Sequence, residues 1–320
     1  MANSTALKQY VDFTKPNTVP VDVTITIKEG RASVKALKRT ESIMKIISTV
    51  LLYAVVLALA LIVVLPFYWM IITSLKSNEE IRRATQTFFP EIVKWENYVL
   101  IFYTFDFGTY MFNTIVVAIF STLGTLITTI FAAFAFARLK FAGREALFML
   151  FLATMMIPGE MMTISNYITV VGYLKGQDKF WSMIIPFLIS VYYIYLLRQN
   201  FKQIPNELYL AAKVDGKSDW NYLWKVMVPL ASPTLISITI LKFMGTWNSY
   251  VWPNLVVPTN NDYRLISNGL RGSGFTDISG ETQYGYQMAA TVLVTVPLFL
   301  LFVFFRKYIM KGVGRAGIKG

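Results

Sequence analysis

Long apolar stretches alternate with short polar ones along most of this chain. Six apolar runs stand out, at about Ile46–Ile72, Phe112–Ala137, Ala146–Val171, Ser182–Leu197, Val226–Val257 and Met288–Phe305. A helix needs roughly 20 apolar residues to cross a hydrocarbon core, so the pattern predicts an all-α membrane protein with six transmembrane helices. The fourth run is short, and the fifth is long enough to tilt or break. Kinks are expected in or near the spans at Pro66, Pro158, Pro186, Pro233 and Pro253.

The six spans define a membrane domain over residues 46–305, between tails at residues 1–45 and 306–320. No apolar run of signal-peptide length precedes Ile46, and we expect no cleavage there. Apolar and polar residues alternate from Val21 to Lys28, which is the period of a half-buried strand. The basic segment that follows is expected to lie among anionic headgroups.

Lysine and arginine are unevenly divided between the two sides that six spans create. The tails and the second and fourth loops together hold 21 of the 30, the other three loops hold 8, and Lys242 lies within a span. Because positively charged loops stay in the cytoplasm, both termini and residues 198–225 are predicted to be cytoplasmic. The outer loop at 73–111 is rich in aromatic residues and is expected to pack on the outer membrane surface. The outer loop at 258–287 is rich in glycine, and either reaches an extracellular partner or is a plain loop.

Composition supports the membrane assignment and removes most enzyme chemistry. Of 320 residues, 55% are hydrophobic and only 15% charged, against roughly 25% charged in ordinary soluble domains. With no cysteine and no histidine, the chain has no disulfides, no thiolate or imidazole metal sites and no histidine-dependent catalysis. The chain therefore offers no evident catalytic groups for an alternative function as an intramembrane enzyme. The net charge of +12 is explained by the inner loops, and no nucleic-acid partner is expected.

The cytoplasmic loop at 204–230 is predicted to be a helical hairpin. Glu207 suits the start of a helix, Gly216 offers a left-handed stop, and a second helix is expected to begin near Ser218. Four residues of the first helix share one face at spacings of three and four, namely Leu208, Ala211, Ala212 and Asp215. Physical chemistry alone leaves two alternatives open, a docking knob for a partner or an interfacial helix on the headgroups.

Two charged residues inside the spans, Glu160 and Lys242, are candidate functional groups because charge is costly at mid-membrane. Counted from the inner ends of their spans, both lie about 21 Å deep at 1.5 Å per residue. We hypothesise that they form an ion pair or face each other across a translocation path, and that a double charge reversal restores transport. The alternative is that each meets water or backbone separately. An aromatic cluster beside them is either part of that path or an interfacial anchor; it comprises Trp247, Asn248, Tyr250 and Trp252.

Residues 210–216, Leu-Ala-Ala-Lys-Val-Asp-Gly, resemble the E-A-A-x-x-D-G signature of ABC-importer permeases. Further segments resemble the maltose-type carbohydrate permease family, among them AAFAFARLKFAG, IIPFLISVYYIYLLRQNF, VPLASPTL, TWNSYVWP and YGYQMAATVLVTVP, and the similarity covers residues 46–320. Leu210 stands where the signature has glutamate, and Lys217 where a small residue is common. The ATPase contact is then expected to be apolar, or to be supplied by Glu207.

The resemblance implies the type I ABC importer fold, with the 204–230 hairpin as the coupling element, in the bacterial plasma membrane. It implies a second permease, two ATPase subunits, an extracellular binding protein and a carbohydrate substrate, with lipid around the spans. Gly216-Lys217-Ser218 resembles the end of a phosphate-binding loop, but Ala211 replaces the first glycine and a helix precedes it. No cofactor is therefore expected in this chain, and ATP and Mg²⁺ belong to the partner ATPase. The alternative function is an ion- or proton-coupled carrier with Glu160 as its titrating group.

Overall fold

Helices make up nearly all regular structure in the computed structural model, which describes residues 21–104, 106–258, 261–271, 275–276 and 280–314. Within those ranges the only strand-like pairing is an isolated antiparallel bridge between Thr276 and Thr282. The all-α class expected from the apolar runs is thereby confirmed. The chain divides into two compact units, one up to Phe67 and the other from Tyr68 onward.

Helix α1 (Val21–Ser74) runs through the first unit, with Pro66 inside it. Every residue from Glu41 to Phe67 is exposed within the described structure, including the apolar run. The strand predicted over Val21–Lys28 is wrong, because helix α1 already begins there. A strand needs a neighbour to satisfy its backbone polar groups, whereas a helix satisfies them internally, and the alternating pattern supplies no neighbour.

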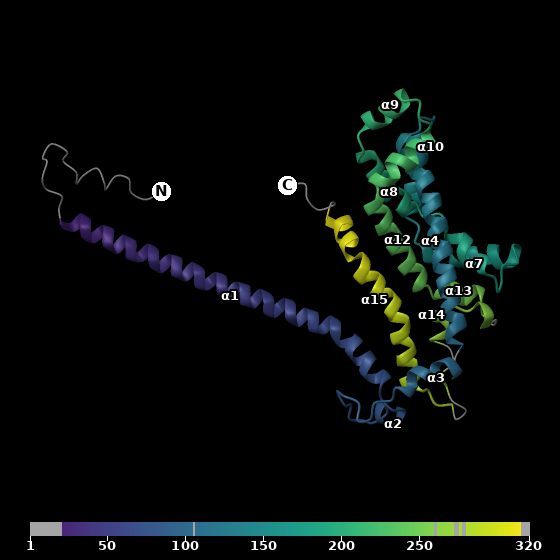
Figure 1. Cartoon of the computed structure of the whole chain (residues 1–320), viewed down its shortest axis with the longest axis horizontal. Coiled ribbons are helices and arrows are strands. Elements are labelled where there is room, and N and C mark those ends of the chain that lie inside the picture. The colour runs from purple at the N-terminus through teal and green to yellow at the C-terminus, as the bar shows by residue number, and fades with distance from the viewer. Residues whose placement is uncertain (1–20, 105, 259–260, 272–274, 277–279, 315–320) are drawn as a thin grey trace. The chain divides into compact units, whose positions relative to one another are not determined.

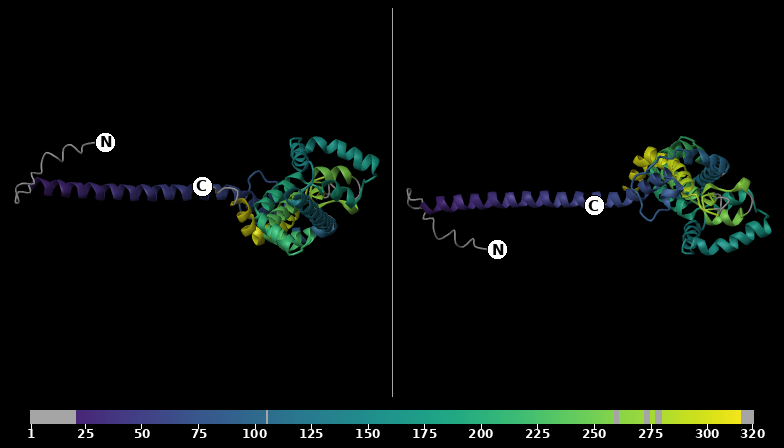
Figure 2. Two further views of the ribbon diagram at one scale, coloured as in Figure 1. Left: turned by 90° about the horizontal axis from the view of Figure 1, so that it is seen from above. Right: turned by 90° about the horizontal axis from the view of Figure 1, so that it is seen from below.

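The second unit begins with the end of α1 and continues through short and long helical segments. In chain order these are α2 (Asn78–Ile81), α3 (Glu96–Thr104), α4 (Phe107–Arg138), α5 (Arg144–Thr154), η2 (Gly159–Met162), α6 (Thr163–Tyr167), η3 (Ile168–Tyr173), α7 (Phe180–Ile184), η4 (Ile185–Phe187), α8 (Val191–Gln203), α9 (Asn206–Val214), α10 (Asp219–Tyr222), η5 (Leu223–Met227), α11 (Val228–Leu230), α12 (Ser232–Trp247), α13 (Val251–Val256), η6 (Asn261–Tyr263), α14 (Ile266–Gly269) and α15 (Tyr284–Gly314). The long helices of this unit lie side by side as one bundle in all three views (Figures 1 and 2).

Three helices are long and apolar enough to cross a membrane, over Glu41–Ser74, Phe107–Arg138 and Tyr284–Lys307. Three bent pairs pass the same test together, and they make six spans if each pair is one span. The pairs are Arg144–Thr154 with Gly159–Tyr173, bent by 86°, Phe180–Phe187 with Val191–Gln203, bent by 45°, and Asp219–Leu230 with Ser232–Trp247, bent by 78°. The fifth run therefore breaks, as its length predicted.

Prolines account for where the bent spans break. Pro158 lies in the first break, Pro186 lies two residues before the second, and Pro229 and Pro233 flank the third. Proline donates no backbone hydrogen bond and disfavours helical geometry in the residue before it. The sequence thus fixes the bends locally.

Helix α4 is the centre of the bundle. It packs against α8 and α12, and α12 packs in turn against α15. One core cluster joins the C-terminal half of α4 to α8, the hairpin and α12 through Phe134, Phe201 and Tyr222. Another joins the N-terminal end of α4 to α3, α14 and α15. The 204–230 hairpin is therefore packed directly on α4, α8 and α12.

Candidate functional site

The hairpin between α8 and α12 has a well-formed turn at Gly216. Its φ of +68° lies in the left-handed region, where glycine is favoured because it has no Cβ. The backbone N–H of Gly216 donates to the carbonyl of Lys213, and that of Lys217 donates to Ala212. These two bonds define a Schellman motif that closes α9. The left-handed stop predicted at Gly216 is confirmed.

The second helix of the hairpin, α10, is capped by Ser218. The Ser218 side chain accepts a hydrogen bond from the backbone N–H of Asn221, which satisfies one of the free donors at the helix start. The second helix predicted near Ser218 is confirmed. The end of α9 at Gly216 and the start of α10 at Ser218 therefore both depend on residues within a few positions.

Helix α9 is apolar on its exposed side. Leu208, Leu210 and Ala211 are exposed, whereas Ala212 is half-buried against the α4–α8–α12 core. Val214 is 88% exposed, the most exposed large apolar side chain in the described residues. The sequence reasoning missed Val214, although it lies four residues after Leu210 and three after Ala211, on the same helical face.

Four side chains fasten α9 to α10. The Tyr209 hydroxyl donates to Asp219 at 2.8 Å, and the Lys213 amino group pairs with the same carboxylate at 2.8 Å. The ring of Tyr209 also meets that of Tyr222 edge-on, at 5.1 Å between centroids. The hairpin is thus held as one piece.

Arginine side chains tie the hairpin and the preceding loop to the bundle. Arg138, at the end of α4, donates to the carbonyls of Phe201 and Ile204 just before α9. Arg198 of α8 is buried, binds both carboxylate oxygens of Glu145, and lies 3.7 Å from the ring centre of Phe148. Arg138 therefore joins the end of α4 to the residues just before α9, and Arg198 joins α8 to α5.

A cavity of about 830 Å³ opens among the helices of the second unit. Four residues singled out in the sequence line it, namely Glu160, Lys242, Tyr250 and Trp252. Polar groups from other helices share the wall, including Ser121 of α4, Asn166 of α6 and Tyr193 of α8. The cavity is therefore lined both by aromatic rings and by hydroxyl and amide groups.

Trp247 and Asn248 do not line this cavity. Lys242, Gly245, Thr246 and Ser249 do, and their spacing of three, four and seven marks one helical face. Trp247 points elsewhere, is 2% exposed and stacks on Phe243. The amide of Asn248 donates to the carbonyl of Met244.

Lys242 binds backbone rather than a carboxylate. Its amino group donates to the carbonyl of Phe187 at 2.9 Å, at the break between η4 and α8. Thr125 of α4 donates to the same carbonyl at 3.3 Å, and Thr128 donates to that of Leu188 at 2.7 Å. Among the described residues no ion pair joins Lys242 to Glu160, and the two side chains share the cavity wall without direct contact.

Comparison with known proteins gives these features a context. Residues 124–315, more than half of the chain, match the family "Binding-protein-dependent transport system inner membrane component". The arabinooligosaccharides transport system permease protein AraQ of Bacillus subtilis is 27% identical over 82% of this chain and 92% of its own. The sn-glycerol-3-phosphate transport system permease protein UgpE of Pectobacterium atrosepticum is 28% identical over 79% and 91%.

A solved structure shares the fold. It belongs to a bacterial ABC transporter involved in the import of the acidic polysaccharide alginate, and the similarity has a TM-score of 0.73 at 23% identity, over 84% of this chain and 98% of that one. The resemblance inferred from the hairpin signature is confirmed. This chain is a transport component rather than an enzyme, and it belongs to the family of binding-protein-dependent transport system inner membrane components.

Proposed function

We propose that this chain is one of two permease subunits in an ATP-driven importer that takes up a carbohydrate delivered by an extracellular binding protein. The observation that carries the proposal is the hairpin, a rigid element with an exposed apolar face in a protein that has no phosphate-binding loop. The carbohydrate is supported by the relative named for arabinooligosaccharides and by the fold shared with an alginate importer.

The proposed arrangement in the bacterial plasma membrane has six spans and both termini in the cytoplasm. The three long helices and three bent pairs are consistent with six crossings, and the 21-to-8 distribution of lysine and arginine favours this orientation. The hairpin then faces the compartment that holds ATP. The tails at 1–45 and 306–320 are proposed to be cytoplasmic.

In this proposal the hairpin docks on an ATPase subunit. Leu208, Leu210, Ala211 and Val214 form an apolar knob, with Glu207 exposed at its N-terminal end and Asp215-Gly216 at the other. Because Leu210 replaces the signature glutamate, apolar contact supplies most of the attraction. Closing of the ATPase pair moves the hairpin, and Arg138 and Tyr222 pass the movement to α4 and α12.

The cavity is proposed as part of the translocation path. Tyr193, Tyr250 and Trp252 offer aromatic faces, while Asn166 and Ser249 offer polar groups. Sugars stack their C–H faces on rings and bond their hydroxyls to such groups, so the lining suits a carbohydrate. The substrate passes between Glu160 and Lys242.

A substitution at Gly216 tests the coupling role. Gly216→Pro is incompatible with φ of +68°, because proline fixes φ near −65°. We expect the variant to reach the membrane and assemble with its partners, but to hydrolyse ATP without carbohydrate uptake. Gly216→Asn is the matched control, since asparagine tolerates the left-handed conformation, and it should keep uptake coupled. Normal uptake by Gly216→Pro would exclude the proposed role.

A further inference from the structure

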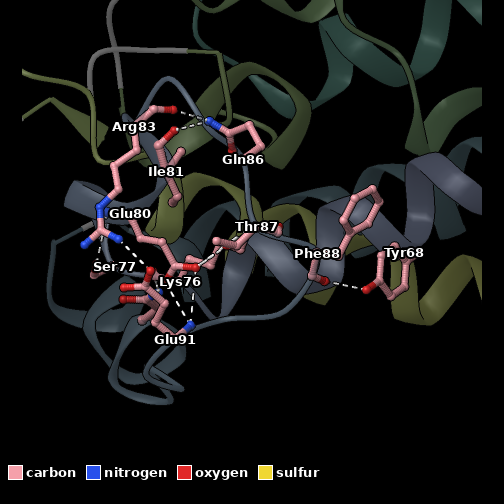
Figure 3. A network of polar contacts seen from close by, with 11 residues as sticks. Tyr68, Lys76, Ser77, Glu80, Ile81, Arg83, Gln86, Thr87, Phe88 and Glu91 are labelled. Carbon is pink, nitrogen blue, oxygen red and sulfur yellow. Dashed lines mark hydrogen bonds and ion pairs between the residues drawn. The ribbon is translucent and has the colours of Figure 1, made fainter.

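A buried charge cluster clamps the segment that follows α1. Lys76 and Glu80 are 1% and 3% exposed, and their charged groups lie 4.0 Å apart. The Lys76 amino group donates to the carbonyl of Thr87, and Glu80 accepts from the Thr87 hydroxyl and from the backbone N–H of Glu91. Figure 3 shows these groups gathered at one point. Residues 80–91 are thereby closed into a tight loop.

The clamp makes the chain fold back along the end of α1. Beyond Thr87, the carbonyl of Phe88 accepts a hydrogen bond from the hydroxyl of Tyr68, which lies away from the charges in Figure 3. The ring of Phe88 meets Trp69 edge-on, and that of Phe89 meets Tyr68 edge-on, at 6.2 and 6.5 Å between centroids. Both phenylalanines therefore lie beside the C-terminal part of the apolar run of α1.

Phe88 and Phe89 are nevertheless 66% and 71% exposed, and Ile92 is 68% exposed. Burying an ion pair has a large desolvation cost and is weak evidence of stabilisation. Here the buried pair holds a short segment that presents apolar side chains outward. The arrangement is explained if those side chains are covered by something outside the chain.

We propose that Phe88, Phe89 and Ile92 form a lipid anchor that inserts into the membrane–water interface at the end of α1. The same helix carries the candidate span Glu41–Ser74, and Tyr68 and Trp69 lie near the C-terminal end of that span. Tyrosine and tryptophan mark the interface of membrane helices, which places the neighbouring phenylalanines at the boundary of the acyl chains. Arg82, Arg83 and Lys94 flank the segment, and each pairs with a glutamate of the same chain.

Site-directed spin labelling tests the anchor, because the chain has no cysteine of its own. The complex purified through this chain is placed in nanodiscs of phosphatidylethanolamine and phosphatidylglycerol, with a nitroxide on Phe89→Cys or Phe88→Cys. Glu79→Cys, an exposed position on α2 in the same loop, is the control. We expect the ratio of access by oxygen to access by a water-soluble nickel chelate to be several-fold higher at 88 and 89 than at 79.

Two outcomes would overturn the anchor. Nickel access at 88 and 89 equal to that at 79 would place the aromatic pair in water, and shielding from both reagents would show that another protein covers it. Adding Glu80→Ala to Phe89→Cys should raise nickel access, because the segment then loses the bonds that Glu80 makes to Thr87 and Glu91. Since the readout is depth and not uptake, it is independent of the proposed substrate and coupling.

Discussion

The amino group of Lys242 stabilises a helix break, in addition to placing a charge in the cavity. Phe187 ends its helical segment with a carbonyl that has no helical partner, and Lys242 and Thr125 supply donors. Inside a membrane such a carbonyl is costly if left unsatisfied. This position therefore needs a hydrogen-bond donor such as the Lys242 amino group, and an ionised carboxylate cannot replace it because it only accepts hydrogen bonds.

This geometry changes the expected result of charge reversal. Lys242→Glu should abolish most uptake, and Glu160→Lys in the same chain should not restore it, because the Phe187 carbonyl still lacks the donor that Lys242 supplies and keeps only the longer bond from Thr125. Lys242→Arg keeps a donor and should retain more uptake than Lys242→Met. The measurement is carbohydrate uptake by the reconstituted importer, and full rescue by the double reversal would instead support a direct ion pair.

Asp219 makes the stability of the hairpin depend on pH in the acid range. Hydrogen bonds from Lys213 and from Tyr209 lower the pKa of Asp219 below its ordinary value of 3.8. A lowered pKa means that the ionised carboxylate stabilises the folded hairpin above pH 3.8, and that this contribution is lost as pH falls through the folded pKa. Near neutral pH Asp219 is ionised, and its contribution to the stability of the hairpin is fully present. Because the pair is partly exposed, solvent weakens it.

Hydrogen exchange can measure that contribution. Asp219→Asn should speed exchange in residues 209–219 at pH 7, and the difference from wild type should shrink as the pH falls below 3.8, after correction for intrinsic rates. Asp215→Asn is the control, because Asp215 has no ion pair among the described residues. Equal exchange in wild type and Asp219→Asn at pH 7 would contradict the prediction.

At the scale of elements, the break in the fourth span is held from α4. Thr128 donates to the carbonyl of Leu188, while its neighbour Thr129 is fully buried with a hydroxyl that has no partner in the described part of the chain. Thr128 is half-buried, and its hydroxyl also reaches the carbonyl of Thr125 in its own helix. The two threonines therefore allow a bonded and an unbonded hydroxyl to be compared at adjacent helical positions.

Thr128→Val should destabilise the protein by about 1 kcal/mol, the usual net value of one hydrogen bond. Thr129→Val should be neutral or stabilising, because valine has the shape of threonine and removes an unpaired buried hydroxyl. Thermal unfolding of both variants in detergent measures the difference. Equal destabilisation would mean that the Leu188 contact has no special role.

At the scale of the whole molecule, the proposed orientation places the hairpin and α2 on opposite sides of the membrane. A cysteine at Lys217 should react with a membrane-impermeant thiol reagent only after cells are permeabilised, whereas one at Glu79 should react in intact cells. Both positions are exposed, and the parent chain has no cysteine. The opposite labelling pattern would show that the topology is inverted and that the hairpin lies on the side away from the ATPase.

Features set by neighbouring residues were predictable. The apolar runs, the prolines at the breaks, the Gly216 turn and the Ser218 cap each depend on interactions within a few positions. Val21–Lys28 is the exception, since its alternation indicated a strand and the structure forms a helix. Strand formation depends on a partner elsewhere in the chain, which a local pattern does not supply.

Features that join distant segments were decided by tertiary structure. The apolar runs predicted that Lys242 and Glu160 lie within spans, but the rotation of α12 determined that Lys242 faces the cavity and Trp247 does not. The partner of Lys242 is a carbonyl 55 residues away, released by a break in another span. The sequence by itself determined the long apolar helices, the ends of the hairpin helices and the family signature. Packing decided which faces meet, because rotation and depth depend on all helices together.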